Sequence, residues 1–399
     1  MHDRRVGLFT RAGAAGAPVA ERRLRPAGAL ALAVSPRGPI AAGGYGRGIV
    51  VLAPDLARRL QRLPVRATVR ALCFTTVDDV ELLGVAFRGR IVAVYARDGA
   101  AAADAPWEPH PLAAWQAHDA MIETAAFVAP GVLATGSRDG TVRLWDAFTG
   151  APRGAPLAAG AAVQGVAALP RGRLAVALLD GRLQRWELTG ARAEAESATG
   201  LRRLTAFAAV PERGLVAAAG ADGLVVAVDP DRLDPLWTER LPTAWVTALA
   251  AAPGGAAALA AGGGDGTVWL LDPAVGDVLA THVPRGRLAA PAVALAFAPD
   301  GTLAALHGGA SVALWRAAVP NAWTLLARFA LRPDLGADLR AALGEAAARA
   351  DPRPLDPWLH HPDGSPYRDP GAAAAPELVR RLQAAVRRAE AARPRTLPG

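Results

Sequence analysis

Apolar residues along the chain gather in short runs that are separated by Gly, Pro and Asp-Gly. The stretch 122–146 shows the order: an apolar run, IETAAFVAP, a second run, VLATGS, a tight turn, RDG, and a third run, TVRLWD. Helices would instead place apolar residues three and four positions apart. The runs therefore predict β-strands that are joined by hairpins.

The Asp-Gly turn recurs at a nearly constant interval. Asp139, Asp180, Asp222 and Asp265 each precede a Gly and a strand-like run, and they are 41, 42 and 43 residues apart. Glycine stands at the turn in three further copies, at Gly46, Gly89 and Gly309. The one longer interval, from Gly89 to Asp139, contains an Ala- and Pro-rich insert. Seven copies of about 40–45 residues with four strands each predict an all-β, seven-bladed β-propeller.

The pattern divides the chain into three parts, which are an N-terminal segment at 1–18, the propeller at 19–319 and a C-terminal extension at 320–399. Residues 19–24, VAERRL, precede the first blade, and we expect them to form the outer strand of the last blade. The extension is expected to hold two helices, at 334–350 and 376–395, on either side of a Pro-rich loop. The first has Leu335, Leu339, Leu343 and Ala347 four residues apart.

The motif ATGSRDGTVRLWD at 134–146 resembles a WD40 repeat, and residues 28–316 are similar to seven degenerate, bacterial-type copies of it. In that family a His, a Ser or Thr of the second strand, the turn Asp and the closing Trp form one hydrogen-bonded network. The resemblance implies a structural network, not a catalytic one. Its members here would be His118, either Thr135 or Ser137, Asp139 and Trp145. The closing Trp recurs as Trp186 and Trp315, but no other blade shows the His.

Composition excludes several kinds of chemistry. All 44 basic residues are Arg, so a P-loop, a protein kinase site or a Schiff-base lysine cannot occur in its usual form. The single cysteine, Cys73, excludes a disulfide within the chain and a thiolate zinc cluster. It lies in an apolar run and is expected to be a small core residue.

Candidate catalytic or metal-binding residues are few. His360, His361 and Asp363 could be read as metal ligands, but adjacent His side chains diverge and no second cluster completes the set. Glu123 is the one acid noted near the start of a first strand. We therefore predict no catalytic residues, no metal and no cofactor, and we predict that the protein is not an enzyme.

The resemblance implies a scaffold for protein–protein contacts, expected to lie within a multiprotein assembly. Two alternatives stay open: a regulatory propeller that senses a ligand or anion, and an enzyme with its site in the central channel. No apolar leader is seen at 1–13, and Pro253 interrupts the longest uncharged stretch, 243–264. We therefore expect no membrane span and a cytoplasmic location.

One surface of the propeller can be named from the turns. In this family the turns equivalent to Asp139 lie on one face of the ring. Blades 5 and 6 bring Asp222 and Asp265 to this face without an adjacent Arg. Blades 1 to 4 bring the candidate partner-binding residues Arg47, Arg88, Arg90, Arg138 and Arg182. We expect these arginines to gain little from partners within the chain and so to bind acidic protein surfaces, with nucleic acid as the less favoured partner.

The net charge of +8 has a simpler explanation as well. Arg stands wherever another chain would use Lys, as a coding bias would produce, and 36 acids are interleaved with the arginines. The basic face of the second predicted helix carries Arg380, Arg381, Arg387 and Arg388. This helix is expected to pack on the propeller, with docking to a partner protein, or contact with nucleic acid or an anionic membrane, as the alternatives.

Overall fold

A computed structural model describes the residues 18–24, 27–45, 48–188, 192–210, 213–253, 258–316 and 337–349. The chain divides into two compact units, Met1–Ala317 and Ala318–Gly399. All the strands described below belong to the first unit.

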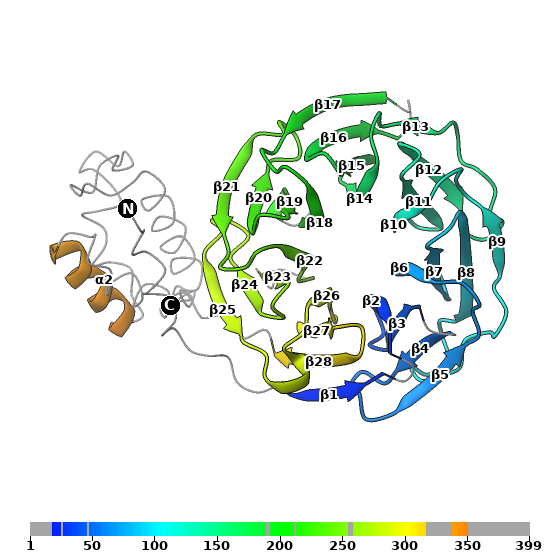
Figure 1. Cartoon of the computed structure of the whole chain (residues 1–399), viewed down its shortest axis with the longest axis horizontal. Helices are drawn as coiled ribbons and strands as arrows, with labels where there is room; N and C mark the ends of the chain where they lie inside the picture. The colour runs from blue at the N-terminus through cyan, green and yellow to red at the C-terminus, as the bar shows by residue number, and fades with distance from the viewer. Residues whose placement is uncertain are drawn as a thin grey trace, which may run out of the picture. The chain divides into compact units, whose positions relative to one another are not determined.

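Seven four-stranded antiparallel sheets surround a central axis (Figure 1). The innermost strands are β2 (Ala29–Val34), β6 (Val69–Val77), β10 (Ile122–Ala129), β14 (Val163–Leu169), β18 (Leu204–Val210), β22 (Val246–Ala251) and β26 (Ala292–Phe297). The second strands are β3 (Ile40–Gly44), β7 (Val80–Phe87), β11 (Val132–Ser137), β15 (Arg173–Leu178), β19 (Leu215–Gly220), β23 (Leu259–Gly263) and β27 (Thr302–His307).

The third strands are β4 (Ile49–Leu52), β8 (Ile91–Asp98), β12 (Thr141–Asp146), β16 (Arg182–Glu187), β20 (Leu224–Val228), β24 (Val268–Leu271) and β28 (Ser311–Arg316). The outer strands are β5 (Arg59–Leu63), β9 (Ala113–Gln116), β13 (Leu157–Ala158), β17 (Arg192–Ala198), β21 (Pro235–Arg240), β25 (Val278–His282) and β1 (Ala20–Arg23). The predicted seven-bladed propeller is confirmed. We number the blades from 1, which begins with β2, to 7, which begins with β26.

The N-terminal strand closes the ring. Strand β1 pairs antiparallel with β28, from Ala20 opposite Leu314 to Arg23 opposite Ser311, and so completes blade 7 (Figure 1). The structure thus confirms the expected closure by residues 19–24. Because the first and last segments of the ring share one sheet, opening it requires breaking a strand ladder as well as separating two blades.

Small apolar side chains fill the spaces between neighbouring blades. Each described core cluster joins residues of two adjacent blades; Leu82 of blade 2, for example, packs with Ile122 and Leu133 of blade 3. Alanines contribute throughout, such as Ala217 and Ala219 between blades 5 and 6. Burial stabilises at about 25 cal/mol per Å² of apolar surface, so many small contacts replace a few aromatic ones.

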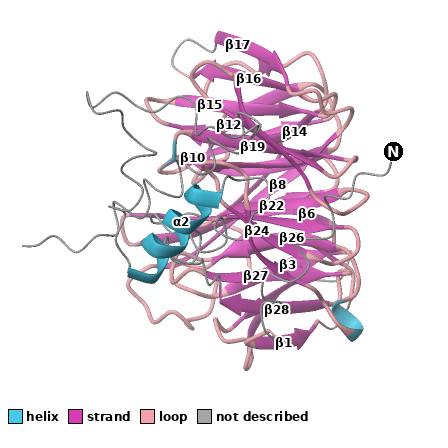
Figure 2. Ribbon diagram, turned by 90° about the vertical axis from the view of Figure 1, so that its left-hand side faces the viewer, coloured by secondary structure: helices cyan, strands magenta, loops and turns pink. Residues whose placement is uncertain are grey.

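The tight turns between second and third strands lie at the end of each blade where its innermost strand begins. Gly140, Gly181, Gly223 and Gly266 follow the turn acids and have φ between +77° and +91°, a conformation that favours glycine. The loops that connect one blade to the next reach the same end. We call this end of the ring the turn face. Figure 2 shows loops and turns gathered at the two faces of the ring, with the strands between them.

In the second unit the structure describes one helix, α2 (Ala337–Arg349). Leu339, Leu343 and Ala346 are its buried side chains, so Ala346 takes the place that the predicted stripe assigned to Ala347. The second predicted helix and the candidate ligands His360, His361 and Asp363 lie outside the described residues. No helix in the described ranges has the length and apolar character that crossing a membrane would need.

Candidate functional site

Polar side chains of blade 3 meet in one network beside its turn. The Nδ1 atom of His118 lies 2.9 Å from Oδ2 of Asp139, and its Nε2 atom lies 2.7 Å from Oγ1 of Thr135. The indole N–H of Trp145 donates to the same Thr135 oxygen at 2.9 Å. The hydroxyl of Thr141 donates to Oδ1 of Asp139 at 2.6 Å. Each ring nitrogen therefore has a partner, which is what buried polar groups require.

Ser137, the alternative to Thr135, lies outside this chain of bonds. Its hydroxyl donates to the carbonyl of Met121 at 3.0 Å and accepts the N–H of Asp139 at 3.2 Å. Burial lowers the pKa of His118, which favours the neutral imidazole. Burial acts to raise the pKa of Asp139, but hydrogen bonds from Thr141 and His118 outweigh it and hold that pKa below its usual range. The network holds the turn in place and has no free nucleophile or base.

Two of the candidate arginines have acidic partners within the chain. The Nε atom of Arg138 lies 2.5 Å from Oε1 of Glu123, whose side chain is only 4% exposed. Arg182 pairs with Asp180 at 2.8 Å and with Glu196 at 2.9 Å. These two arginines are therefore less available to an outside acid than their turn positions suggested: Glu123 and Glu196 come from other strands, and Asp180 lies in the same turn as Arg182.

Arg88 and Arg90 remain exposed on the turn face, and neither has an ion-pair partner among the described residues. Arg88 donates to the hydroxyl of Tyr45 at 2.6 Å and lies over its ring, with 5.7 Å from Cζ to the ring centroid. Tyr45 is itself 59% exposed. Arg47 lies outside the described residues.

The second residue of every innermost strand falls at a shift in strand register. Seven equivalent side chains therefore occur near the start of these strands: Leu30, Arg70, Glu123, Gln164, Thr205, Thr247 and Val293. Their nature changes around the ring. Blades 2 to 4 have charged or amide groups, whereas blades 7 and 1 have apolar ones. In blades 5 and 6 threonine hydroxyls lie 2.6 Å from the carbonyls of Val246 and Ala292 in the next blade.

Glu123 is fully engaged within this layer. Its Oε2 atom accepts from Nε of Arg70 at 2.8 Å, and its Oε1 atom accepts from Arg138. Both oxygens are thus held by cations, so this carboxylate ties blade 2 to the turn of blade 3 and is not placed to remove a proton. The sequence alone did not single out Arg70 as a partner of Glu123. The signal that could have indicated it is its position as the second residue of an innermost strand, which is also the position of Glu123.

Comparison with known proteins agrees with this geometry. Residues 110–146, which contain the His118 network, match the family model for the WD domain, G-beta repeat. A chain in the crystal structure of the Mitotic Checkpoint Complex superposes with a TM-score of 0.64 at 17% identity, covering 75% of this chain and 91% of that one. The RRP9 WD40 repeats give a TM-score of 0.64 at 16% identity, covering 75% and 99%, and U3-55K gives 0.63 at 18%, covering 75% and 100%. No curated protein matches the chain.

The chain is a seven-bladed β-propeller, and residues 110–146 in its third blade match the WD40 repeat. Two further imidazoles lie against Trp315, the closing residue of blade 7, and the sequence did not point to them: His282 ends β25 of blade 6, and His307 ends β27 of blade 7. The rings of His282 and His307 lie 5.3 and 5.5 Å from that of Trp315, between centroids. Both histidines are buried, and neither ring nitrogen of His282 has a hydrogen-bond partner within the part of the chain that the structure describes. Burial lowers the pKa of His282 to about 4 and also lowers that of His307.

The insert of blade 2 docks on blade 1. Trp107 is 2% exposed, and its backbone N–H and carbonyl bond with the side chain of Gln61 in β5 at 2.7 and 2.8 Å. Arg97 lies over the Trp107 ring and pairs with the buried Glu81, which also accepts from the hydroxyl of Ser35 in blade 1. The insert is therefore a clip between two blades.

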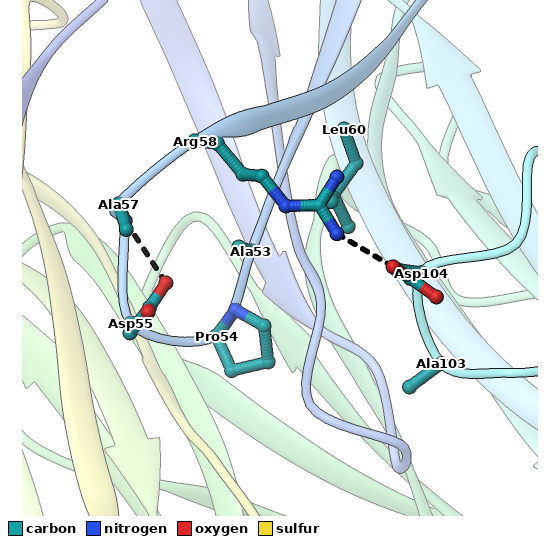
Figure 3. A pocket seen from close by; sticks show the side chains of 8 residues that line it. All are labelled: Ala53, Pro54, Asp55, Ala57, Arg58, Leu60, Ala103 and Asp104. Carbon is teal, nitrogen blue, oxygen red and sulfur yellow. Dashed lines mark hydrogen bonds and ion pairs between the residues drawn. The ribbon is translucent and has the colours of Figure 1, made fainter.

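A pocket of about 400 Å³ lies where the insert meets the turn after β4, on the face opposite the turn face (Figure 3). Arg58 reaches across it to Asp104 at 2.5 Å, while the carboxylate of Asp55 accepts the N–H of Ala57. The charged groups of its wall thus already have partners. Its lining residues are Ala53, Pro54, Asp55, Ala57, Arg58, Leu60, Ala103 and Asp104.

Cys73 is half-buried and makes no disulfide. Burial raises the pKa of its thiol to about 12, so it is not a thiolate at neutral pH. It packs between blades 2 and 3, as expected of a small core residue.

Proposed function

We propose that this WD40 propeller is a non-enzymatic scaffold whose turn face binds other proteins. The observation that carries the proposal is the occurrence, on that face, of exposed apolar side chains together with arginines that have no ion-pair partner among the described residues. Four large hydrophobic side chains are exposed there: Tyr45, Trp245 and Val283 in turns or inter-blade loops, and Ile91 as the first residue of β8. The other four that are exposed among the described residues lie toward the opposite face. Apolar groups that remain exposed beside polar ones are typical of interaction surfaces.

The charged side chains of the turn face also favour it as the binding surface. Arg88 and Arg90 offer exposed guanidinium groups beside Tyr45, and a guanidinium suits the planar geometry of a carboxylate. The partner that fits is therefore a protein segment that combines acidic and apolar side chains. Arg138 and Arg182 contribute to the same surface, but their charges are already balanced by acids of the chain. One of the similar folds comes from a structure of a complex, which agrees with a place in an assembly.

The proposal is favoured over an enzyme by the surroundings of Glu123. This acid was the sequence candidate for a channel site, and two arginines occupy both of its oxygens. A sensor that binds an anion at Arg70 would first have to displace that carboxylate. The proposal includes a cytoplasmic location, in keeping with the unpaired Cys73. Cell fractionation checks the location.

The test is affinity capture from the native cell, followed by crosslinking and mass spectrometry of the captured proteins. We expect crosslinks to the turn face and reduced recovery for Arg88→Glu combined with Arg90→Glu. The matched control is Arg213→Glu, an exposed arginine at the opposite face. Raising the salt concentration should weaken capture by the unaltered chain. Crosslinks that map to the opposite face, with equal recovery for both variants, would refute the proposal.

A further inference from the structure

The turn of blade 5 is flanked by two inter-blade loops that bond to it directly. The N–H of Ala221 in the turn donates to the carbonyl of Arg203 at 3.1 Å. On the other side the N–H of Leu241 donates to the carbonyl of Gly223 at 2.9 Å. The loop before β18 and the loop before β22 are thus fixed to one turn, and their side chains share one part of the turn face.

Trp245, in the loop before β22, differs from the other tryptophans. It is 46% exposed, whereas the seven other tryptophans in the described ranges are buried or half-buried. Its carbonyl accepts the N–H of Gly264 in the blade 6 turn at 3.1 Å. A Cβ atom at Gly264 would lie 2.2 Å from the indole nitrogen. The glycine therefore makes room for an indole that is held at the surface, where it is already ordered for a partner.

The loop before β18 supplies the charge. Arg202 and Arg203 are both exposed, and no ion pair with a described residue involves either of them. The buried side chains of Leu201 and Leu204 anchor the loop on either side of the pair. Two adjacent guanidinium groups without an ion-pair partner among the described residues are available to carboxylates from outside the chain.

We infer that Arg202, Arg203 and Trp245 together bind a short acidic peptide segment of a partner protein. Its carboxylates pair with the two arginines, and an adjacent apolar or aromatic side chain covers the indole. This inference rests on the proposed scaffold function and gives its partner a chemical signature. A nucleic acid fits less well, because Asp222 and Asp265 stand on the turns at either side of Trp245 and repel a continuous phosphate backbone. A short peptide can place an acid at the arginines and an apolar group on the indole without passing over Asp222 or Asp265.

The test is selection from a displayed library of random peptides of about ten residues. The full chain should enrich peptides with Asp or Glu next to a Phe, Leu or Trp. The Trp245→Ala variant should lose the preference for the apolar residue and keep that for acids. The pair Arg202→Glu with Arg203→Glu should do the reverse. Each variant should weaken binding of the best peptide at least about tenfold, about 1.4 kcal/mol. Phe148→Ala and Arg213→Glu, exposed residues of the opposite face, are the matched controls.

Three results would overturn the inference: no enriched motif, a motif without acids, or enrichment that the three substitutions leave unchanged. A short uridine-rich RNA that binds more tightly than the best peptide, and loses binding in Trp245→Ala, would overturn the peptide assignment. The scaffold proposal is tested separately, by the crosslinking of captured proteins. If crosslinks to captured proteins still map to the turn face, the scaffold stands and only this location is wrong.

Discussion

Blades 3 and 5 carry the same Asp-Gly turn but surround it differently. In blade 3 the turn acid Asp139 bonds with His118, and that network continues to Thr135 and Trp145. In blade 5 the strand register places Ala218 and Val228 at the positions of Thr135 and Trp145, so no such network can form. The exposed side chains of blade 5 lie instead in the loops on either side of its turn.

This difference separates two uses of one repeat. Where polar side chains bond to one another, they stabilise the blade and leave little for a partner. Where arginines and an indole remain exposed beside a turn that needs no network, they are available for recognition. The best-preserved repeat is therefore not the best candidate for a binding site.

Trp145→Ala should have the largest effect on stability. The side chain is 7% exposed and packs on Trp115 with 5.6 Å between ring centroids, so its removal leaves a cavity and takes a donor from Thr135. We expect a loss of about 3–5 kcal/mol in the free energy of unfolding. The matched change in blade 5, Val228→Ala, should cost about 1–3 kcal/mol. Denaturant unfolding measures the free energy lost in each variant. Equal losses would contradict the proposed difference between blades 3 and 5.

Asp139→Ala should cost about 1–3 kcal/mol, because His118 and Thr141 would each lose a buried partner. Asp222→Ala should cost less than about 1 kcal/mol, since the described bond of its carboxylate is to the N–H of Leu224. The same melts test this pair. A larger loss for Asp222 than for Asp139 would mean that blade 5 has a network of its own.

Acid should destabilise the fold where His282, in the outer strand of blade 6, packs on Trp315 of blade 7. The pKa of His282 is lowered to about 4 in the fold, so its contribution is complete above the unfolded pKa of 6.5 and is lost as the pH falls toward 4. We expect this group to account for about 1–2 kcal/mol of the loss. Stability measured from pH 7 to 4 should fall less steeply in His282→Leu. An unchanged slope would show that the imidazole is hydrated in the fold.

Arg182→Ala should have the smallest effect, below about 1 kcal/mol, because its two ion pairs are exposed to solvent. It should also leave partner capture unchanged, unlike Arg88→Glu with Arg90→Glu. Loss of capture in a folded Arg182→Ala protein would return this arginine to the recognition surface.

The ring itself was predictable, because Asp-Gly turns at a period of 41 to 43 residues survive even where other motif residues are lost. The His118 network was predictable in kind, but the choice between Thr135 and Ser137 depends on which side chain faces the indole. The turn acids also marked the end of the ring that carries the turn face. The repeat period and the motif residues can be read from the sequence alone, so the ring, the network and the turn face follow from them directly.

Contacts between distant residues were not predictable in this way. Gln61 and Trp107 are 46 positions apart, and nothing in either segment indicates the other. His282 lies ten residues before β26, whereas His118 lies four residues before β10. The spacing of the repeat motif therefore does not point to His282. Glu123 and Glu196, which pair with Arg138 and Arg182, come from other strands, whereas Asp180 lies in the same turn as Arg182. Which arginines stay free therefore depends on packing around each turn.

The most direct test of the central claim, that the turn face of the ring is the recognition surface, is site-specific photo-crosslinking in the native cell. A benzophenone amino acid would replace Ala244, which is exposed beside Trp245, or Phe148, which is exposed on the opposite face. Both proteins should fold with unchanged melting curves. We predict covalent adducts with a partner protein from position 244 and none from position 148. Adducts from position 148 alone would contradict the assignment of the turn face.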